Sequence, residues 1–259
     1  MQDRSTRHAG VPDVAEQARF GARAVLAGVA IGLVAVPFAL LLLMVDSRWT
    51  PLLRIDHGAR DALHALAVDE AGFVTALKVV STVGSASVYV PLFAALTAWL
   101  AWRGLGRLAM FVAVTMLGSW LLNSLVKVAV DRVRPVLPDP VAHAGGMSFP
   151  SGHAQSATVA ASVLLLVFLP ALRGNPRRRR LAVAAAVAWV VVVAFSRVGL
   201  GVHYLSDVLA GVVLGSAWVL ATTALFSVGR RERGRPPVAP SQGLEPEHAA
   251  RLGADRPMR

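Results

Sequence analysis

The sequence contains no cysteine and few charged residues, and both shortages narrow the class of protein. Without cysteine the chain can form neither a disulfide bond nor a thiolate metal site. Charged residues make up only 16% of the 259 residues, whereas apolar residues make up 55%. A mean hydropathy of +0.58 goes with this balance, and such a composition is typical of membrane proteins. We therefore predict an integral membrane protein of the all-α class rather than a soluble domain.

Six apolar stretches are candidates for transmembrane helices, because a run of about 20 apolar residues spans the hydrocarbon core of a bilayer. The first stretch is too long for the apolar region of a signal peptide, and no small-residue cleavage site follows it. The second is the shortest and could begin a few residues earlier. The predicted spans are residues 22–45, 88–102, 108–126, 153–169, 181–195 and 204–228.

The remaining segments are polar or mixed. We expect residues 1–21 to be a loose tail and the Pro-, Gly- and Arg-rich residues 229–259 to be disordered, on either side of a transmembrane domain at 22–228. Residues 46–73 mix charges with leucines at helical spacing, which leaves two interpretations open. They form either a helix in the membrane interface, anchored by Trp49, or a connecting helix packed on the bundle. The Gly/Ser-rich residues 81–87 predict a turn.

The net charge of +11 is distributed unevenly over the two sides of the predicted bundle. Six spans place both termini and the basic turns 103–107 and 173–180 on one side. That side carries 18 Lys and Arg against 7 acidic residues, and the opposite side carries 8 of each. Cytoplasmic loops are the ones enriched in Lys and Arg, so we expect both termini in the cytoplasm of a multi-pass cell-membrane protein. No nucleic acid is needed to explain the charge, because the basic tails have no interleaved aromatic residues.

The stretch Ser148-Phe149-Pro150-Ser151-Gly152-His153 combines chain-breaking residues with the start of a long apolar run. We expect a helix to begin there, with the backbone amides of Ser151, Gly152 and His153 unpaired at the positive end of its dipole. Such a helix start can bind an anion. His153 adds a group that exchanges protons near neutral pH. The alternative is an ordinary membrane helix capped by Ser151.

Polar residues gather in three clusters on the side opposite to the termini. Asp131 and Arg132, which lie within the first cluster, are interpreted as solvated loop charges. The clusters are Lys127 with Arg134-Pro135, then the stretch ending in His153, and then Ser196-Arg197 with His203 and Asp207.

Together the three clusters could bind and transfer a phosphate group. Lys127, Arg134 and Arg197 are cations, and arginine offers a planar fork that matches phosphate oxygens. His203 and Asp207 are four residues apart, so on a helix they share one face and can form a hydrogen bond. A carboxylate bound to one ring nitrogen leaves the other nitrogen free as a nucleophile.

Each of these residues also has a purely structural interpretation. Lys127 could extend from a helix end to the interface, Arg197 could be an interfacial anchor, and His203 with Asp207 could be a structural pair. Ionisable groups are expensive at membrane depth, and here several of them lie at the ends of adjacent helices. Their gathering favours a functional site.

The motifs Lys-x6-Arg-Pro, Pro-Ser-Gly-His and Ser-Arg-x5-His-x3-Asp occur in this order over residues 127–207. They resemble the three signature motifs of the type-2 phosphatidic acid phosphatase family, with every position intact. Vanadium-dependent haloperoxidases share this site, but they are soluble.

The resemblance implies a role for each matching residue. His203 would attack phosphorus and form a phosphohistidine, Asp207 would orient it, and His153 would protonate the leaving oxygen and later activate water. No metal or cofactor is expected, because three cations would neutralise the phosphate. The implied phosphate ligands are Lys127, Arg134, Ser151, Gly152 and Arg197.

These expectations describe a six-helix membrane phosphatase acting on a lipid phosphate or pyrophosphate in the outer leaflet. The Arg- and Ala-rich composition favours a bacterium, where undecaprenyl or another polyprenyl pyrophosphate, the carrier of cell-wall biogenesis, is the leading candidate. Phosphatidylglycerol phosphate and phosphatidic acid are the alternatives. A non-catalytic lipid-binding or transport protein is a second class, disfavoured because His153, His203 and Asp207 are all present.

Overall fold

The computed structural model describes residues 32, 35–231 and 242–252. All regular elements in these residues are helices, so the all-α prediction is confirmed. The helices are Ala35–Asp46, α2 (Thr50–Asp69), α3 (Ala71–Val83), α4 (Ala86–Trp102), α5 (Gly106–Val130), α6 (Gly152–Phe168), η1 (Leu169–Leu172), α7 (Pro176–Gly199), α8 (Leu205–Arg231), η3 (Pro246–His248) and α9 (Ala249–Leu252).

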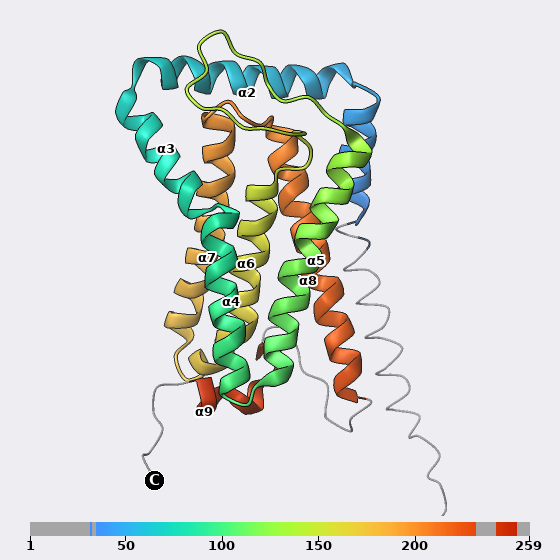
Figure 1. The fold of residues 1–259 in the computed structure, drawn as a ribbon, viewed down its shortest axis with the longest axis vertical. Coiled ribbons are helices and arrows are strands. Elements are labelled where there is room, and N and C mark those ends of the chain that lie inside the picture. The colour runs from blue at the N-terminus through green and yellow to red at the C-terminus, as the bar shows by residue number, and fades with distance from the viewer. Residues whose placement is uncertain (1–31, 33–34, 232–241, 253–259) are drawn as a thin grey trace, which may run out of the picture.

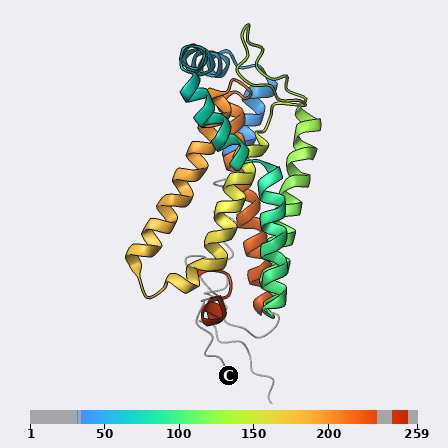
Figure 2. The same ribbon diagram turned by 60° about the vertical axis from the view of Figure 1, so that its left-hand side comes forward.

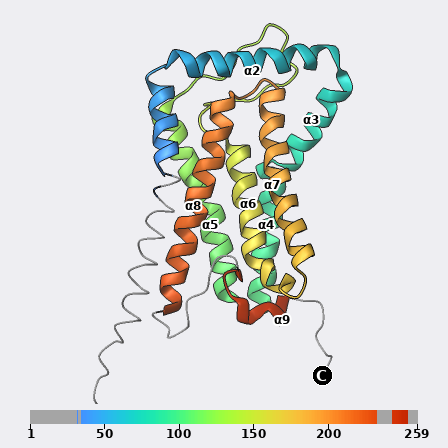
Figure 3. The same cartoon turned by 180° about the vertical axis from the view of Figure 1, so that it is seen from behind.

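The long helices α4 to α8 form an upright bundle, and α2 lies across one end of it (Figure 1). The long α5–α6 connection, residues 131–151, and the short α7–α8 connection reach the same end, which is also seen from behind (Figure 3). We call this the α2 end, and the opposite end, where the last short helix lies, the α9 end. Toward the α9 end α7 inclines away from α6 (Figure 2).

Five described helices are long and apolar enough to cross a membrane. The bent pair formed by Ala35–Asp46 and α2, with an angle of 90° between its halves, would make a sixth. Half of the predicted first span, residues 22–31 with 33 and 34, lies outside the described residues. The third to sixth predicted spans correspond to α5, α6, α7 and α8.

The second span is longer than predicted, because the candidate membrane segment covers Ala71–Trp102. The predicted turn at 81–87 is wrong for most of its length, since α3 continues through Val83 and α4 begins at Ala86. Thr82 stays helical and its hydroxyl donates to the carbonyl of Lys78, 2.9 Å away. Only Gly84 and Ser85 separate the two helices.

Residues 46–73 contain α2, which packs on α7 and α8 while its outer face stays exposed. Leu52, Asp56 and Ala67 are buried beneath it. Trp49 and Ile55 are exposed. The helix is therefore a connecting element packed on the bundle that also presents apolar side chains outward.

The closest helix packing in the bundle joins α6 to α8 near the α2 end. A Cβ atom on Gly211 would lie 2.5 Å from the carbonyl oxygen of Ser151, and one on Gly215 would lie 3.0 Å from that of Gln155. Glycine at these positions lets the two backbones approach, as small residues commonly do between membrane helices. This packing brings the start of α6 against the start of α8.

The C-terminal segment differs from the predicted disorder of residues 229–259. Helix α8 continues to Arg231, and residues 242–252 pack on the α9 end of the bundle. Leu244 and Leu252 are buried there, and the amide of Leu244 donates to the carbonyl of Leu166 at 3.0 Å. Burial of these two leucines stabilises the folded conformation of this otherwise polar segment.

Candidate active site

His203 and Asp207 meet where α7 connects to α8. His203 precedes α8 and Asp207 lies in its first turn, with 3.4 Å between His203 Nδ1 and Asp207 Oδ2. The amide of Tyr204 donates to the same carboxylate oxygen at 2.9 Å, as expected for an acidic residue at a helix start. Both side chains are almost fully buried. The predicted pair is thus brought together inside the protein.

Ser148 completes the surroundings of the Asp207 carboxylate. Its hydroxyl donates to Asp207 Oδ2 and lies 3.4 Å from His203 Nδ1. The residue is fully buried, and its amide donates to the carbonyl of Arg132 at 2.7 Å. Ser148 is not among the predicted site residues, although it is the first residue of the stretch that ends in His153.

Arg134 lies on the other side of the His203 ring. Its Nη1 is 3.0 Å from His203 Nε2 and 2.7 Å from the carbonyl oxygen of Val202. A guanidinium can only donate, so Nε2 is the accepting nitrogen and the ring proton is assigned to Nδ1, which faces Asp207. Burial lowers the pKa of His203 to about 4, although hydrogen bonding to Asp207 acts in the opposite direction. The imidazole is therefore neutral at pH 7, with a lone pair on Nε2.

Lys127 and Arg134 both bind the loop that precedes α6. Lys127 Nζ donates to the carbonyl of Met147 at 2.6 Å, and Arg134 Nε donates to that of Gly146 at 2.9 Å. Burial lowers the pKa of Arg134, though its guanidinium stays protonated. The two cations of the first motif therefore converge on one loop.

Arg197 and Ser151 carry buried polar atoms without a hydrogen-bond partner among the described residues. Arg197 Nη1 donates to the hydroxyl of Ser81, but its Nε has no acceptor. Ser151 is the N-cap of α6, yet its hydroxyl makes no capping bond and is also unpartnered. Buried donors of this kind are costly unless a ligand or water satisfies them.

The start of α6 differs from the prediction in one respect. The amide of Ser151 is not free, because it donates to the backbone carbonyl of Asp207 at 2.9 Å. Close packing of α6 on α8 accounts for this bond. Gly152 and His153 are the first two residues of α6. The cationic groups of Arg197, Arg134 and Lys127 lie close enough to His153 to interact with it electrostatically.

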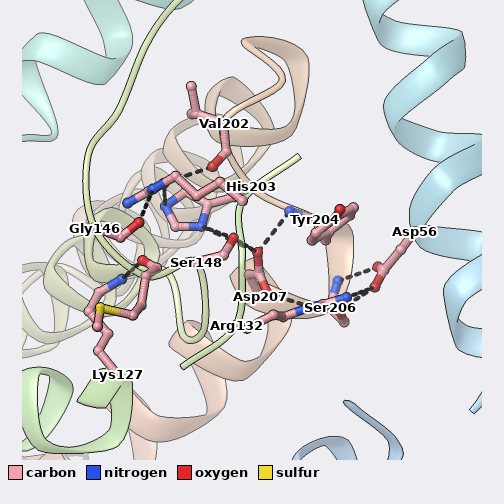
Figure 4. Close-up of polar contacts among 12 residues, drawn as sticks. Asp56, Lys127, Arg132, Gly146, Ser148, Val202, His203, Tyr204, Ser206 and Asp207 are labelled. Atoms are coloured by element: carbon pink, nitrogen blue, oxygen red, sulfur yellow. Dashed lines mark hydrogen bonds and ion pairs between the residues drawn. The ribbon is translucent and has the colours of Figure 1, made fainter. Parts of the chain in front are cut away.

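The interpretation of Arg132 as a solvated loop charge is wrong. Its guanidinium donates to Asp207 Oδ1 at 2.6 Å and to Asp56 Oδ2 at 2.8 Å (Figure 4), and it lies 4.2 Å from the ring centre of Tyr204. Its neighbour Asp131 is exposed, as expected. No local pattern marks Asp56 or Arg132, because only the fold places α2 beside the first turn of α8.

A possible metal-binding group lies at the α9 end. Among the described residues, Glu245, Glu247 and His248 could place one ligand atom each around an ion. Glu245 is also 3.2 Å from Arg107 Nε and 3.3 Å from His248. None of these residues belongs to the three predicted clusters.

Comparison with known proteins identifies a family whose sequence model matches the segment that carries the motifs. The sequence model of the PAP2 superfamily matches residues 108–231, which include every residue of the three clusters. The chain is 32% identical over 141 residues to phosphatidylglycerophosphatase B of Bacillus subtilis, covering 52% of this chain and 66% of that protein. It is 31% identical over 126 residues to lipid A 1-phosphatase of Rhizobium etli, covering 45% of this chain and 50% of that relative.

The fold also resembles a solved structure. The crystal structure of the first transmembrane PAP2 type phosphatidylglycerolphosphate phosphatase from Bacillus subtilis aligns with a TM-score of 0.64 at 24% identity. The alignment covers 73% of this chain and 94% of that chain. This likeness confirms the expected fold, and the sequence matches confirm the expected family. The matched regions span 66% and 50% of the length of the two curated relatives.

Proposed function

The chain belongs to the PAP2 superfamily, and on that premise we propose that it is an integral membrane lipid phosphatase. The observation that carries the proposal is the environment of His203. Its Nδ1 faces the Asp207 carboxylate, and its Nε2 faces the guanidinium of Arg134 at 3.0 Å. A neutral imidazole held in this way has a nucleophilic nitrogen next to a cation that can bind phosphate.

In the first chemical step the Nε2 lone pair of His203 attacks phosphorus. The Nε2–P bond forms while the bond from phosphorus to the lipid oxygen breaks. The negative charge of the bound phosphate favours a protonated His153, which gives its proton to that oxygen, so the lipid leaves as an alcohol, or as a monophosphate from a pyrophosphate. The Asp207 carboxylate stabilises the positive charge that develops on the imidazole.

In the second step water hydrolyses the phosphohistidine. His153, now neutral, accepts a proton from the water molecule whose oxygen attacks phosphorus. The P–Nε2 bond breaks, inorganic phosphate leaves, and His203 returns to its neutral form. The reaction needs no oxidant, reductant or second substrate.

The phosphate oxygens would be held by groups from all three motifs. Buried donors that lack a partner, Arg197 Nε and the Ser151 hydroxyl, support this assignment. Preorganised donors of this kind stabilise the charge of the transition state. The complete set is Lys127, Arg134, Arg197, the Ser151 hydroxyl and the Gly152 amide.

An apolar groove supports a lipid as the substrate. It has a volume of about 680 Å³ and is lined by α2, α6, α7 and α8. Its lining includes Val198, the residue after Arg197, and Val208, the residue after Asp207. A hydrocarbon tail in this groove would therefore begin close to the proposed phosphate site.

The names of the relatives favour a lipid phosphomonoester as the substrate. The first relative is a phosphatidylglycerophosphatase, and the second is a lipid A 1-phosphatase. We therefore rank phosphatidylglycerol phosphate first, with undecaprenyl pyrophosphate and phosphatidic acid as the alternatives. The excess of basic residues at the α9 end places the active site, in this proposal, at the outer leaflet.

The test is phosphate release by the purified, detergent-solubilised protein with EDTA present. The panel contains phosphatidylglycerol phosphate, undecaprenyl pyrophosphate, phosphatidic acid, lipid A 1-phosphate and a soluble phosphomonoester. His203→Ala should lower turnover by a factor on the order of 10³ or more. The matched control His143→Ala, in the exposed part of the α5–α6 connection, should retain wild-type turnover.

A preference for one lipid phosphate identifies the substrate. Failure to release phosphate from any of them, by protein that still binds them, overturns the proposal in favour of a non-catalytic lipid-binding protein. Turnover that survives His203→Ala would show that the nucleophile is another residue. Loss of activity in EDTA would contradict the metal-free mechanism.

A further inference from the structure

Asp56 is a fully buried carboxylate on α2, outside all three motifs. Each of its oxygens accepts hydrogen bonds from residues distant in sequence. Oδ1 accepts from the amide of Ser206 at 2.8 Å, and Oδ2 accepts from the Ser206 hydroxyl at 2.6 Å and from Arg132 Nη2 at 2.8 Å. A carboxylate of α2 therefore binds the buried N-terminus of α8, where the helix dipole favours negative charge.

Arg132 connects Asp56 to the active site. Its Nη1 donates to Asp207 Oδ1 at 2.6 Å, on the side of the carboxylate that does not face His203. The Cζ atom of the guanidinium also lies over the ring of Tyr204, 4.2 Å from its centre. The result is a series of charges in the order Asp56, Arg132, Asp207, in which both carboxylates are buried and the guanidinium is partly buried.

The charges in this series depend on one another. Two buried carboxylates share one guanidinium, and a buried charge is tolerated only when it is paired and hydrogen-bonded. Arg132 also occupies one oxygen of Asp207, so only Oδ2 is left for Ser148, the Tyr204 amide and His203. The orientation of the Asp207 carboxylate is thus fixed from its far side.

We propose that Asp56 and Arg132 are positioning residues of the active site. Arg132, itself held by Asp56, fixes the Asp207 carboxylate so that Oδ2 faces Nδ1 of His203. Helix α2, which carries Asp56, therefore helps to position the active site in addition to lying across the end of the bundle. The inference rests on the proposed function for its kinetic consequence, but the contacts themselves do not depend on the substrate.

The expected signature is a loss of kcat with little change in KM. Arg132 binds Asp207 Oδ1, whereas the proposed phosphate site is at His203 Nε2, on the opposite side of the ring. Arg132→Gln should lower kcat by about 100-fold and change KM by less than about threefold, as expected when a hydrogen bond to a buried charge is lost. Arg132→Lys, which keeps the charge but not the planar fork, should recover part of the loss.

A double-mutant cycle tests the route from Asp56 through Arg132. Asp56→Asn should lower kcat by about tenfold, and adding it to Arg132→Gln should cost less than about a further twofold. The matched controls are Asp61→Asn and Arg54→Gln, exposed residues of the same helix, and both should keep wild-type kcat. Unchanged kcat in Arg132→Gln, or additive losses in the cycle, overturns the proposal.

A second measurement does not require turnover. The proton on His203 Nδ1 should give a downfield NMR signal because the N–H group donates a hydrogen bond to the Asp207 carboxylate. That signal should move in Arg132→Gln and Asp56→Asn but not in Asp61→Asn. If it stays in place in all three variants, the positioning role is excluded. Inactivity of the wild type on every lipid would instead contradict the proposed function and leave this readout to decide the positioning role.

Discussion

His203 lies between a carboxylate and a guanidinium, and this setting determines how it titrates. Burial is the main cause of its lowered pKa, and the charges of Arg134 and Arg197 act in the same direction. The Asp207 carboxylate opposes them. A histidine whose pKa is lowered stays in the neutral, nucleophilic form down to a lower pH than a free imidazole, whose pKa is about 6.5.

We therefore predict that kcat/KM does not begin to fall on the acidic side until the pH is well below 6. This ratio reports the ionisation of the free enzyme, in which His203 must be neutral to attack phosphorus. The acidic limb should fall near the His203 pKa of about 4. The measurement is kcat/KM between pH 3.5 and 8 with a short-chain lipid phosphate in detergent, corrected for the fraction of folded protein. An acidic limb at pH 6.5 would contradict the buried, neutral His203.

Site residues could be predicted from sequence only where a motif carries them. His203 and Asp207 are four residues apart, so local geometry predicts their contact. Asp56 and Arg132 are 76 residues apart, and their contact depends on how α2 lies across the bundle. The paired Ser151 amide was missed for the same reason, since its acceptor is the carbonyl of Asp207 on another helix.

At the scale of helices, the site depends on close packing of α6 against α8. The carbonyl of Ser151 and the nitrogen of Gln155 lie 2.5 Å and 3.2 Å from the position of a Cβ on Gly211. Both are backbone atoms, which cannot rotate away as a flexible side chain would. Separating the two helices would also separate Ser151 from Asp207.

Gly211→Ala should therefore destabilise the protein and lower its activity. Overpacking of this kind costs about 1–3 kcal/mol, and we expect a lower Tm together with at least about a tenfold lower turnover. Gly58→Ala is the control, because Gly58 lies within α2 and a Cβ there has nothing within 4 Å. It should keep wild-type activity and gain up to about 1 kcal/mol from helix propensity. Equal behaviour of the two variants would refute the packing argument.

The helices themselves were predictable to different degrees. Long apolar runs predicted α5 to α8, because length and hydropathy are local properties. The turn between α3 and α4 was predicted too broadly, since Ser81 and Thr82 stay helical and Ser81 bonds to Arg197. The order in residues 242–252 was not foreseen, because Leu244 and Leu252 gain their stability only from the helix ends on which they pack.

At the scale of the whole molecule, two basic turns and the candidate site lie at opposite ends of the bundle. The turns 103–107 and 173–180 are at the α9 end, whereas the α5–α6 connection and the His203 region are at the α2 end (Figure 1). The positive-inside rule predicts that the α9 end faces the cytoplasm. A lipid phosphate would then be hydrolysed at the outer surface, and its phosphate released outside the cell.

The absence of cysteine makes this orientation directly testable, because any introduced cysteine is the only thiol in the chain. Val136 is 80% exposed in the α5–α6 connection, and Gly174 is exposed in the turn before α7. A membrane-impermeant maleimide should label Val136→Cys in intact cells and Gly174→Cys only after the membrane is opened. Both variants should retain phosphatase activity, which shows that the labelled protein is folded. The reverse pattern would place the site in the cytoplasm, so that its substrate would have to come from the inner leaflet.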